Sequence, residues 1–216
     1  MSTRILQALA AISAILLFAG CETALVDADT TFDPTYRKAI VVVGIGKELT
    51  ADYAHYQAFI WRPYDPETGR PMSEERKIIL RWPRCWPPEN KHECKPSGFK
   101  YYAFIVDPGD YFFHYIFTEV HSQKHVRTYL TGQEKTKHGT RINRWANVLD
   151  SKAPRFDVEA GEAVYIGDFI FGGHEQIRSL KNLRFDLTAA QTYISQFPGV
   201  AAPLEPRPAM MHLLTN

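Results

Sequence analysis

The chain has 216 residues, of which 45% are hydrophobic, and its 25 lysine and arginine side chains almost balance its 24 aspartate and glutamate side chains. This balance excludes the basic excess that is typical of nucleic-acid-binding proteins, and the hydrophobic content excludes a wholly disordered chain. The length suits one domain or two very small ones, so we expect an apolar core and no nucleic-acid partner.

The N-terminal segment has the pattern of an export signal. Arg4 gives it a positive charge. An apolar run from Ile5 to Ala19 follows and is about 15 residues long, whereas a membrane-spanning helix needs roughly 20. A run of this size is typical of a secretory signal peptide, so we predict that residues 1–20 are a cleaved signal.

Residues 17–21, Leu-Phe-Ala-Gly-Cys, resemble the lipobox of bacterial lipoproteins, in which an aliphatic residue and two small residues precede the cysteine. Phe18 departs from the family pattern, which usually has leucine there. The resemblance implies that Cys21 carries a diacylglyceryl group and a fatty acid such as palmitate, whose buried methylenes each contribute about 0.8 kcal/mol to membrane binding. In this family an aspartate after the cysteine retains the protein at the inner membrane, so Glu22 implies the periplasmic side of the outer membrane. The alternative is an ordinary secretory signal with an incidental cysteine.

Two further cysteines, Cys85 and Cys94, remain once Cys21 is lipidated. In an oxidising periplasm such a pair is expected to form a disulfide, which would contribute about 2–3 kcal/mol by restricting the unfolded chain. A metal site that also uses His92 and a pair of free thiols are the alternatives. Three ligands without a fourth at a recognised spacing make a poor zinc site, so we predict no metal and no cofactor.

Segments rich in β-branched and aromatic residues recur along the rest of the chain. They cover residues 39–45, 53–61, 77–82, 101–106, 111–117, 126–130, 156–171 and 180–187. Residues 186–196 have helical character, with Thr188 as a possible N-cap. This order predicts a mainly β fold, an antiparallel β-sandwich with one short C-terminal helix. We assign residues 21–37 to the lipidated N-terminus and a tether, 38–198 to the sandwich domain and 199–216 to a proline-rich tail.

The segment Asp107-Pro-Gly-Asp110 has proline and glycine where a type II turn needs them. We predict that it joins its flanking strands as a β-hairpin, and that Gly109 is more sensitive to substitution than Gly69, which lies in an outer turn. This turn and the pattern of residues 156–167, Phe-Asp-Val-Glu-Ala-Gly-Glu-Ala-Val-Tyr-Ile-Gly, resemble small β-sandwich lipoproteins of the bacterial envelope. The resemblance covers residues 99–171 and implies the fold without any active site.

Two motifs associated with enzymes occur in surroundings that do not suit them. Gly44-Ile-Gly46 lacks the third glycine of a dinucleotide-binding loop, since position 49 is leucine. Ser97-Gly-Phe-Lys100 has the spacing of the penicillin-recognising enzymes, but Pro96 and Gly98 do not suit the helix that this motif opens. We therefore predict no catalytic residues.

Histidines and aromatic residues gather in the middle of the chain. His114, His121, His125 and His138 are expected to be exposed in loops, with a metal role as the alternative. Aromatic residues stand at positions 101, 102, 111–113, 115 and 117 of two strands, several of them consecutive, so they should point to both faces and serve mostly as core. A ligand platform on the outer face is the alternative to a purely structural role.

Two functional hypotheses from different classes follow. The first is a lipid-anchored structural or protein-interaction module of the cell envelope, without catalysis, held to the membrane by its lipid and bound to an envelope protein. The second is an envelope hydrolase or small-ligand-binding protein whose site is assembled from loops. A pocket that gathers polar groups with perturbed pKa values would favour the second, and a flat apolar patch would favour the first.

We expect Cys85 and Cys94 to be bonded to each other in protein taken from the cell envelope. Mass spectrometry of non-reduced peptides should find the cross-linked pair, and prior reduction should abolish it. Two alkylatable thiols in the native protein would contradict the pairing.

Overall fold

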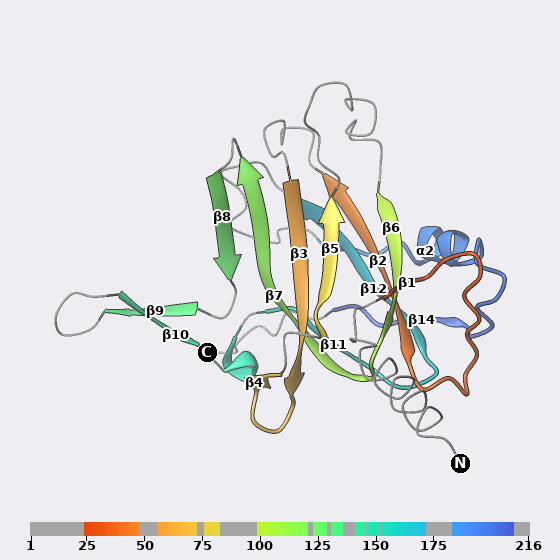
Figure 1. The fold of residues 1–216 in the computed structure, drawn as a ribbon, viewed down its shortest axis with the longest axis horizontal. Coiled ribbons are helices and arrows are strands. Elements are labelled where there is room, and N and C mark those ends of the chain that lie inside the picture. The colour runs from red at the N-terminus through yellow and green to blue at the C-terminus, as the bar shows by residue number, and fades with distance from the viewer. Residues whose placement is uncertain are drawn as a thin grey trace, which may run out of the picture.

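The computed structural model describes residues 24–47, 56–72, 76–82, 99–120, 123–128, 131–135, 141–145, 147–151, 153–171 and 183–209. Within these residues the protein is mainly β, as the sequence predicts, and contains two six-stranded sheets (Figure 1). The other described elements are the two-stranded ribbon of β9 (Thr131–Lys135) and β10 (Arg141–Trp145), the 3-10 helix η3 (Val148–Asp150) and helix α2 (Leu187–Ile194).

The first sheet has the strand order β1–β6–β2–β12–β13, and β14 also pairs with β12. Its strands are β1 (Ala24–Leu25), β2 (Ala39–Lys47), β6 (Lys100–Val106), β12 (Ala163–Phe171), β13 (Leu183–Arg184) and β14 (Leu204–Pro206). The central strand β2 reads as a continuous apolar run because both of its faces are covered by core clusters. β12 pairs in parallel with β2 and with β14, so the prediction of a wholly antiparallel arrangement is wrong. The whole second sheet lies between β2 and β12 in sequence, and so long a connection permits a parallel return.

The second sheet has the order β11–β7–β3–β4, with β5 also paired to β3 and β8 to β7. Its strands are β3 (Tyr56–Asp65), β4 (Arg70–Pro71), β5 (Ile78–Trp82), β7 (Gly109–Val120), β8 (Gln123–Thr128) and β11 (Arg155–Val158). β3 continues past residue 61, where the segment predicted from the sequence ends, and includes Pro63. Pro63 is opposite Tyr111 of β7, and its carbonyl accepts from the Met72 N–H at 2.8 Å on the other side of the strand, so the position that lacks an N–H faces away from β7.

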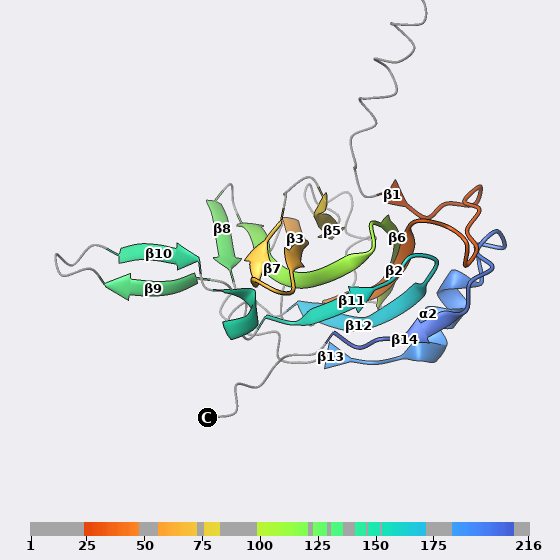
Figure 2. The ribbon, with the colours of Figure 1, turned by 90° about the horizontal axis from the view of Figure 1, so that it is seen from below.

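The two sheets share one apolar core. Trp61 of β3 is 1% exposed, and its ring meets Phe113 and Phe156 of the second sheet edge-on at centroid distances of 5.0 and 5.2 Å. The same ring meets Phe169 of the first sheet at 5.2 Å. Figure 2 shows the two layers on either side of this core. Because truncating such a buried aromatic residue costs about 3–5 kcal/mol, contacts around Trp61 hold the layers together.

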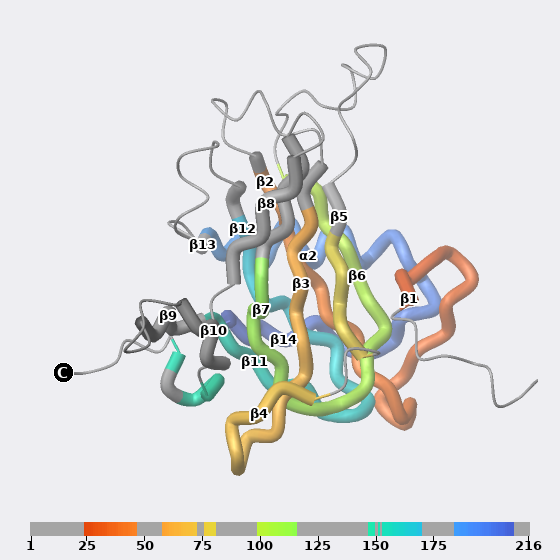
Figure 3. Tube along the Cα trace, turned by 60° about the vertical axis from the view of Figure 1, so that its left-hand side comes forward, coloured from red at the N-terminus to blue at the C-terminus, as the bar shows by residue number. Residues whose placement is uncertain are grey.

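A second core cluster covers the outer face of the first sheet. Helix α2 contributes Ala190, and the N-terminal segment contributes Val26 and Phe32, both buried. Phe32 is fully buried and its backbone bonds to Gly199 and Ala201, so the red and blue parts of the chain lie side by side (Figures 1 and 3). The described parts of the expected tether and tail therefore belong to the folded domain.

Asp186, rather than Thr188, caps the N-terminus of α2. The Asp186 carboxylate accepts a hydrogen bond from the Ala189 N–H at 3.1 Å, whereas Thr188 already lies inside the helix. The sequence offered two residues of N-cap type two positions apart, and the earlier one forms the cap.

The turn at Asp107–Asp110 does not close a hairpin. β6 belongs to the first sheet and β7 to the second, so the chain crosses from one layer to the other at this turn. Phe104 of β6 and Phe113 of β7 are both buried in the core that the two sheets share. Proline and glycine signalled the reversal of the chain correctly, but a reversal does not determine whether the flanking strands pair with each other.

The β3–β4 connection is a true hairpin, with Gly69 at φ +64°. A Cβ at Gly69 would lie 1.6 Å from Oδ1 of Asn147. That Asn147 side chain donates to the Thr68 carbonyl at 2.9 Å and accepts from the Leu149 N–H at 2.8 Å. Gly69 therefore sits beneath a cap that holds η3 against the turn. A Cβ at Gly109, where φ is +142°, would meet nothing within 4 Å.

These surroundings indicate that Gly69 is more sensitive to substitution than Gly109, which is the reverse of the order predicted from the sequence. We expect Gly69→Ala to lower the free energy of unfolding by about 2 kcal/mol, through left-handed strain and one displaced hydrogen bond. Gly109→Ala should cost about 1 kcal/mol through strain alone. Urea denaturation of both variants measures the difference, and an equal or larger loss at Gly109 would contradict this reading of the turn.

Candidate functional site

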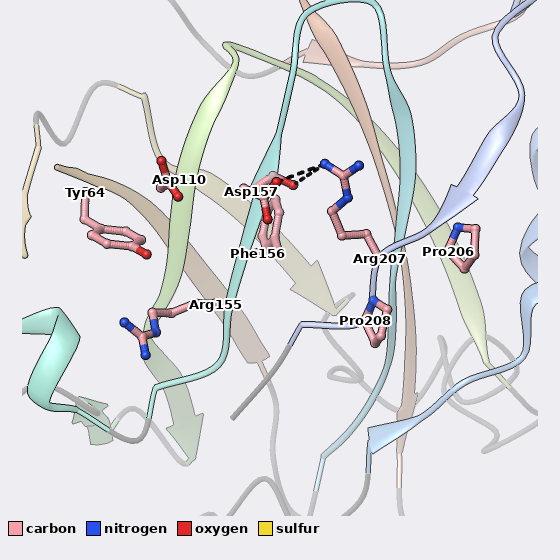
Figure 4. A pocket seen from close by; sticks show the side chains of 8 residues that line it. All are labelled: Tyr64, Asp110, Arg155, Phe156, Asp157, Pro206, Arg207 and Pro208. Carbon is pink, nitrogen blue, oxygen red and sulfur yellow. Dashed lines mark hydrogen bonds and ion pairs between the residues drawn. The ribbon is translucent and has the colours of Figure 1, made fainter. Parts of the chain in front are cut away.

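A pocket of about 300 Å³ opens where the end of the second sheet meets the C-terminal segment. Its lining residues are Tyr64, Asp110, Arg155, Phe156, Asp157, Pro206, Arg207 and Pro208 (Figure 4). They come from β3, β7, β11 and β14 and from the residues that follow β14. Segments far apart in the sequence thus build one polar site.

Strand register explains why four of these side chains converge. Asp157 of β11 lies directly opposite Asp110 of β7, and Asp110 lies opposite Tyr64 of β3. Opposite residues of paired strands share a face, and so do residues two apart in one strand, which adds Arg155. Sequence reasoning missed this group. Polar and buried residues alternate along β11, but the sequence does not show which strands β11 joins.

Arg207 is committed to ion pairs. Its Nη1 lies 3.0 Å from Asp157 Oδ2 and 2.8 Å from Glu162 Oε2, and its Nη2 lies 3.0 Å from Glu162 Oε1. Burial would raise the pKa of Glu162, but the Glu159 N–H and the Arg207 guanidinium outweigh it and hold the pKa below its ordinary value. The forked geometry fastens the segment after β14 to the edge of the domain.

On the opposite wall of the pocket, the pKa values of Asp110 and Tyr64 are raised. Burial raises the pKa of Asp110, and the nearby Asp157 carboxylate raises it further. Burial also raises the pKa of Tyr64, together with the charge of Asp110, while the nearby Arg155 guanidinium opposes the shift. Figure 4 shows Arg155 reaching toward Tyr64 and Arg207 toward Asp157.

This wall suits recognition of a small polar ligand by charge and hydrogen bonding. Two like charges placed directly opposite across paired strands repel each other, and the Arg207 guanidinium offsets part of that repulsion here. The described lining includes no serine, cysteine or histidine, so within it we find no pairing of a nucleophile with a base. The Asp110 carboxyl group, with its raised pKa, and the Tyr64 phenol have acid–base potential among these lining residues.

A second polar cluster surrounds Asp168, which is fully buried on the outer face of the first sheet. The Tyr165 hydroxyl donates to Asp168 Oδ1 at 2.5 Å, and the Tyr101 hydroxyl donates to Oδ2 at 3.3 Å. The Asp186 N–H in turn donates to the Tyr165 oxygen at 3.0 Å. These bonds join the N-cap of α2 to the sheet.

A β-bulge in β12 makes this cluster possible. Tyr165 is opposite Val42 and Asp168 is opposite Gly44, so β12 carries one residue more than β2 between these pairs. Without the bulge, residues three apart would point to opposite faces; with it, Tyr165 and Asp168 share one. Gly167 adopts φ +115° at the bulge. Gly44 leaves room for the carboxylate, since a Cβ there would lie 2.0 Å from Asp168 Oδ1. Gly44-Ile-Gly46 thus lies within strand β2, and its first glycine makes room for the Asp168 side chain.

Burial raises the pKa of Asp168, although the two tyrosine hydroxyls and Arg184 favour its charged form. Burial, followed by the charge of Asp168, raises the pKa of Tyr101 to about 12. The pKa of Asp186 is lowered by its bond to the Ala189 N–H and by Arg184. Since Asp168 has no exposed surface, we interpret the cluster as a structural joint between α2 and the sheet.

Most residues singled out from the sequence lie elsewhere. Cys21, Cys85, Cys94, His121 and His138 fall outside the described residues. His114 is 3% exposed within β7 and packs against Phe112 and Tyr115, so its prediction as an exposed loop residue is wrong. His114 lies within residues 111–117, which the strand pattern already covers, so the loop assignment conflicted with that pattern. His125 lies in β8, which is a strand rather than a loop.

No family model, curated protein sequence or solved structure matches the chain. Among the described residues, no helix has the length and hydropathy needed to cross a bilayer. The same residues contain no group of three potential metal ligands. Functional inference therefore depends on the local chemistry of the chain.

We predict that Asp168 makes stability fall as the pH rises. Because folding raises the pKa of Asp168 above its ordinary value of 3.8, the folded state retains this proton at pH values where the unfolded chain has lost it. The contribution is fully present below 3.8 and is lost as the pH rises through the folded pKa. Acidification from about pH 7 to pH 4.5 should therefore stabilise the wild type relative to Asp168→Asn.

Urea denaturation at the two pH values measures this difference. Asp33→Asn is the control, because the pKa of Asp33 is lowered by its hydrogen bonds with Thr35 and its effect has the opposite sign. An identical pH dependence in the wild type and Asp168→Asn would show that Asp168 does not titrate as described.

Proposed function

We propose that this chain is a lipid-anchored protein of the bacterial cell envelope, whose domain acts as a non-catalytic structural or protein-interaction module. The observation that carries the proposal is the lipobox-like segment, residues 17–21, at the end of an apolar run of signal-peptide length. Lipid on Cys21 provides the anchor. A mainly β fold with two sheets around one core supports an antiparallel-rich β-sandwich as the exported domain.

The polar groups of the domain support a role without catalysis. Arg207, Asp157 and Glu162 are tied together in ion pairs, and Asp168 is buried in a joint between α2 and the first sheet. Groups used in this way stabilise the fold and are not free to react. An envelope protein is the partner class that fits, and the balanced charge gives no support for nucleic acid.

Glu22 favours the outer membrane, on the side facing the periplasm, by the sorting pattern of the lipoproteins that the signal resembles. The periplasm is oxidising, which favours a disulfide between Cys85 and Cys94.

A small-ligand-binding protein or hydrolase is the second candidate, favoured by the pocket around Asp110. The raised pKa of this carboxyl group and the nearby Arg155 are features of a polar binding site. The two candidates differ in what they require of this pocket. A protein-interaction module that binds elsewhere tolerates Arg155→Gln, whereas a ligand-binding protein that uses the pocket does not.

We expect a clickable fatty-acid analogue to label the wild-type protein in growing cells and to leave Cys21→Ser unlabelled. The reason is that only the residue-21 thiol receives lipid in this signal type. Cys85→Ser should remain labelled and serves as the matched control. Equal labelling of the wild type and Cys21→Ser would sink the anchor and the proposed location with it.

A further inference from the structure

We infer that the β1 edge of the domain lies directly on the membrane surface, with Leu25 in contact with lipid. This inference rests on the proposed lipidation of Cys21 and adds an orientation to it. In this orientation, the boundary between lipid headgroups and acyl chains covers the exposed apolar side chain at the β1 edge.

The chain joins the fold immediately after the proposed anchor. Ala24 pairs with Ile105 and Leu25 with Phe104, and the Val26 N–H donates to the Ala103 carbonyl at 2.9 Å. Residue 24 is therefore already part of the first sheet, and Val26 is buried.

Covalent geometry then limits how far the domain can stand from its lipid. Two residues separate Cys21 from Ala24, so the two Cα atoms are at most about 11 Å apart when the chain is fully extended. The acyl chains must lie in the hydrocarbon, and the polar layer above it is only about 5–8 Å thick on each side. A domain held on so short a connection rests with β1 against the headgroups.

The side chain at this position suits that contact. Leu25 is 54% exposed, the largest exposed fraction among the described large apolar residues. An exposed leucine beside a lipid anchor can bury its side chain at the boundary of headgroups and acyl chains. Leu149 in η3 is also an exposed leucine, at 36%, but η3 lies at the opposite side of the domain from β1 in both ribbon views (Figures 1 and 2).

Site-directed fluorescence in membranes tests this orientation. Full-length lipidated Leu25→Cys and Leu149→Cys variants are labelled with an environment-sensitive fluorophore and placed in vesicles of phosphatidylethanolamine and phosphatidylglycerol that carry headgroup nitroxides. The unsubstituted chain, labelled in parallel, measures any background from the other cysteines. We expect several-fold stronger quenching at residue 25 than at residue 149, and unchanged melting temperatures.

A flexible insert gives the second arm. About ten Gly and Ser residues placed between Thr23 and Ala24 lengthen the connection while leaving Leu25 in its place, so quenching at residue 25 should fall toward that at residue 149. Retained strong quenching would show that the edge binds lipid through its own surface and would overturn the dependence on a short connection.

The outcomes separate this inference from the proposed function. Mass spectrometry of the same samples reports lipid on Cys21. If lipid is present and residues 25 and 149 are quenched equally, the orientation is wrong while the anchor stands. If lipid is absent, the anchor proposal fails and the orientation fails with it. Energy transfer between labels at residue 25 of two copies, without nitroxide quenching, would overturn the membrane contact in favour of a dimer edge.

Discussion

The structure depends on the aromatic contacts through which two sheets share one core. Trp61 contacts Phe113 and Phe156 of its own sheet and Phe169 of the other. Each sheet therefore buries its inner face only by packing against the other sheet. Because the core lies between layers, the chain must cross from one layer to the other. Two of its four crossings lie in turns that the structure describes, the turn before β7 and the turn between β11 and β12, where Gly161 adopts φ +80°. Both crossings use glycines that a local reading assigns to simple turns.

The sequence predicts where strands lie much better than how they pair. Apolar alternation is a local property, and the segments at 39–45, 77–82 and 101–106 coincide with β2, β5 and β6. Pairing depends on contacts between distant residues. The turn at Asp107–Asp110 therefore yielded a wrong hairpin although its position was correct, and the parallel pairing of β2 with β12 had no local signal at all.

The candidate sites divide in the same way. The anchor at Cys21 is written in consecutive residues and can be proposed without any structure. The pocket cannot, because Asp110, Asp157 and Tyr64 meet only through the register of three strands. The joint around Asp168 needs still more, since a bulge changes which face this residue occupies. A strand-like pattern with an aspartate in it could have marked Asp168 as an unusual buried charge, but its two tyrosine partners depend on the fold.

The structure of residues 24–37 bears directly on how far the domain would lie from the proposed anchor at Cys21. If residues 24–37 were free, as the sequence pattern suggested, the chain between Cys21 and β2 would be a long tether, and the domain would lie well away from the proposed anchor. Burial of Phe32 and its backbone bonds to Gly199 and Ala201 hold that segment on the first sheet. The short connection itself is set earlier in the chain, where Ala24 and Leu25 pair with β6 and the Val26 N–H donates to the Ala103 carbonyl. The pairing of β1 with β6 therefore limits how far the domain could lie from the proposed anchor.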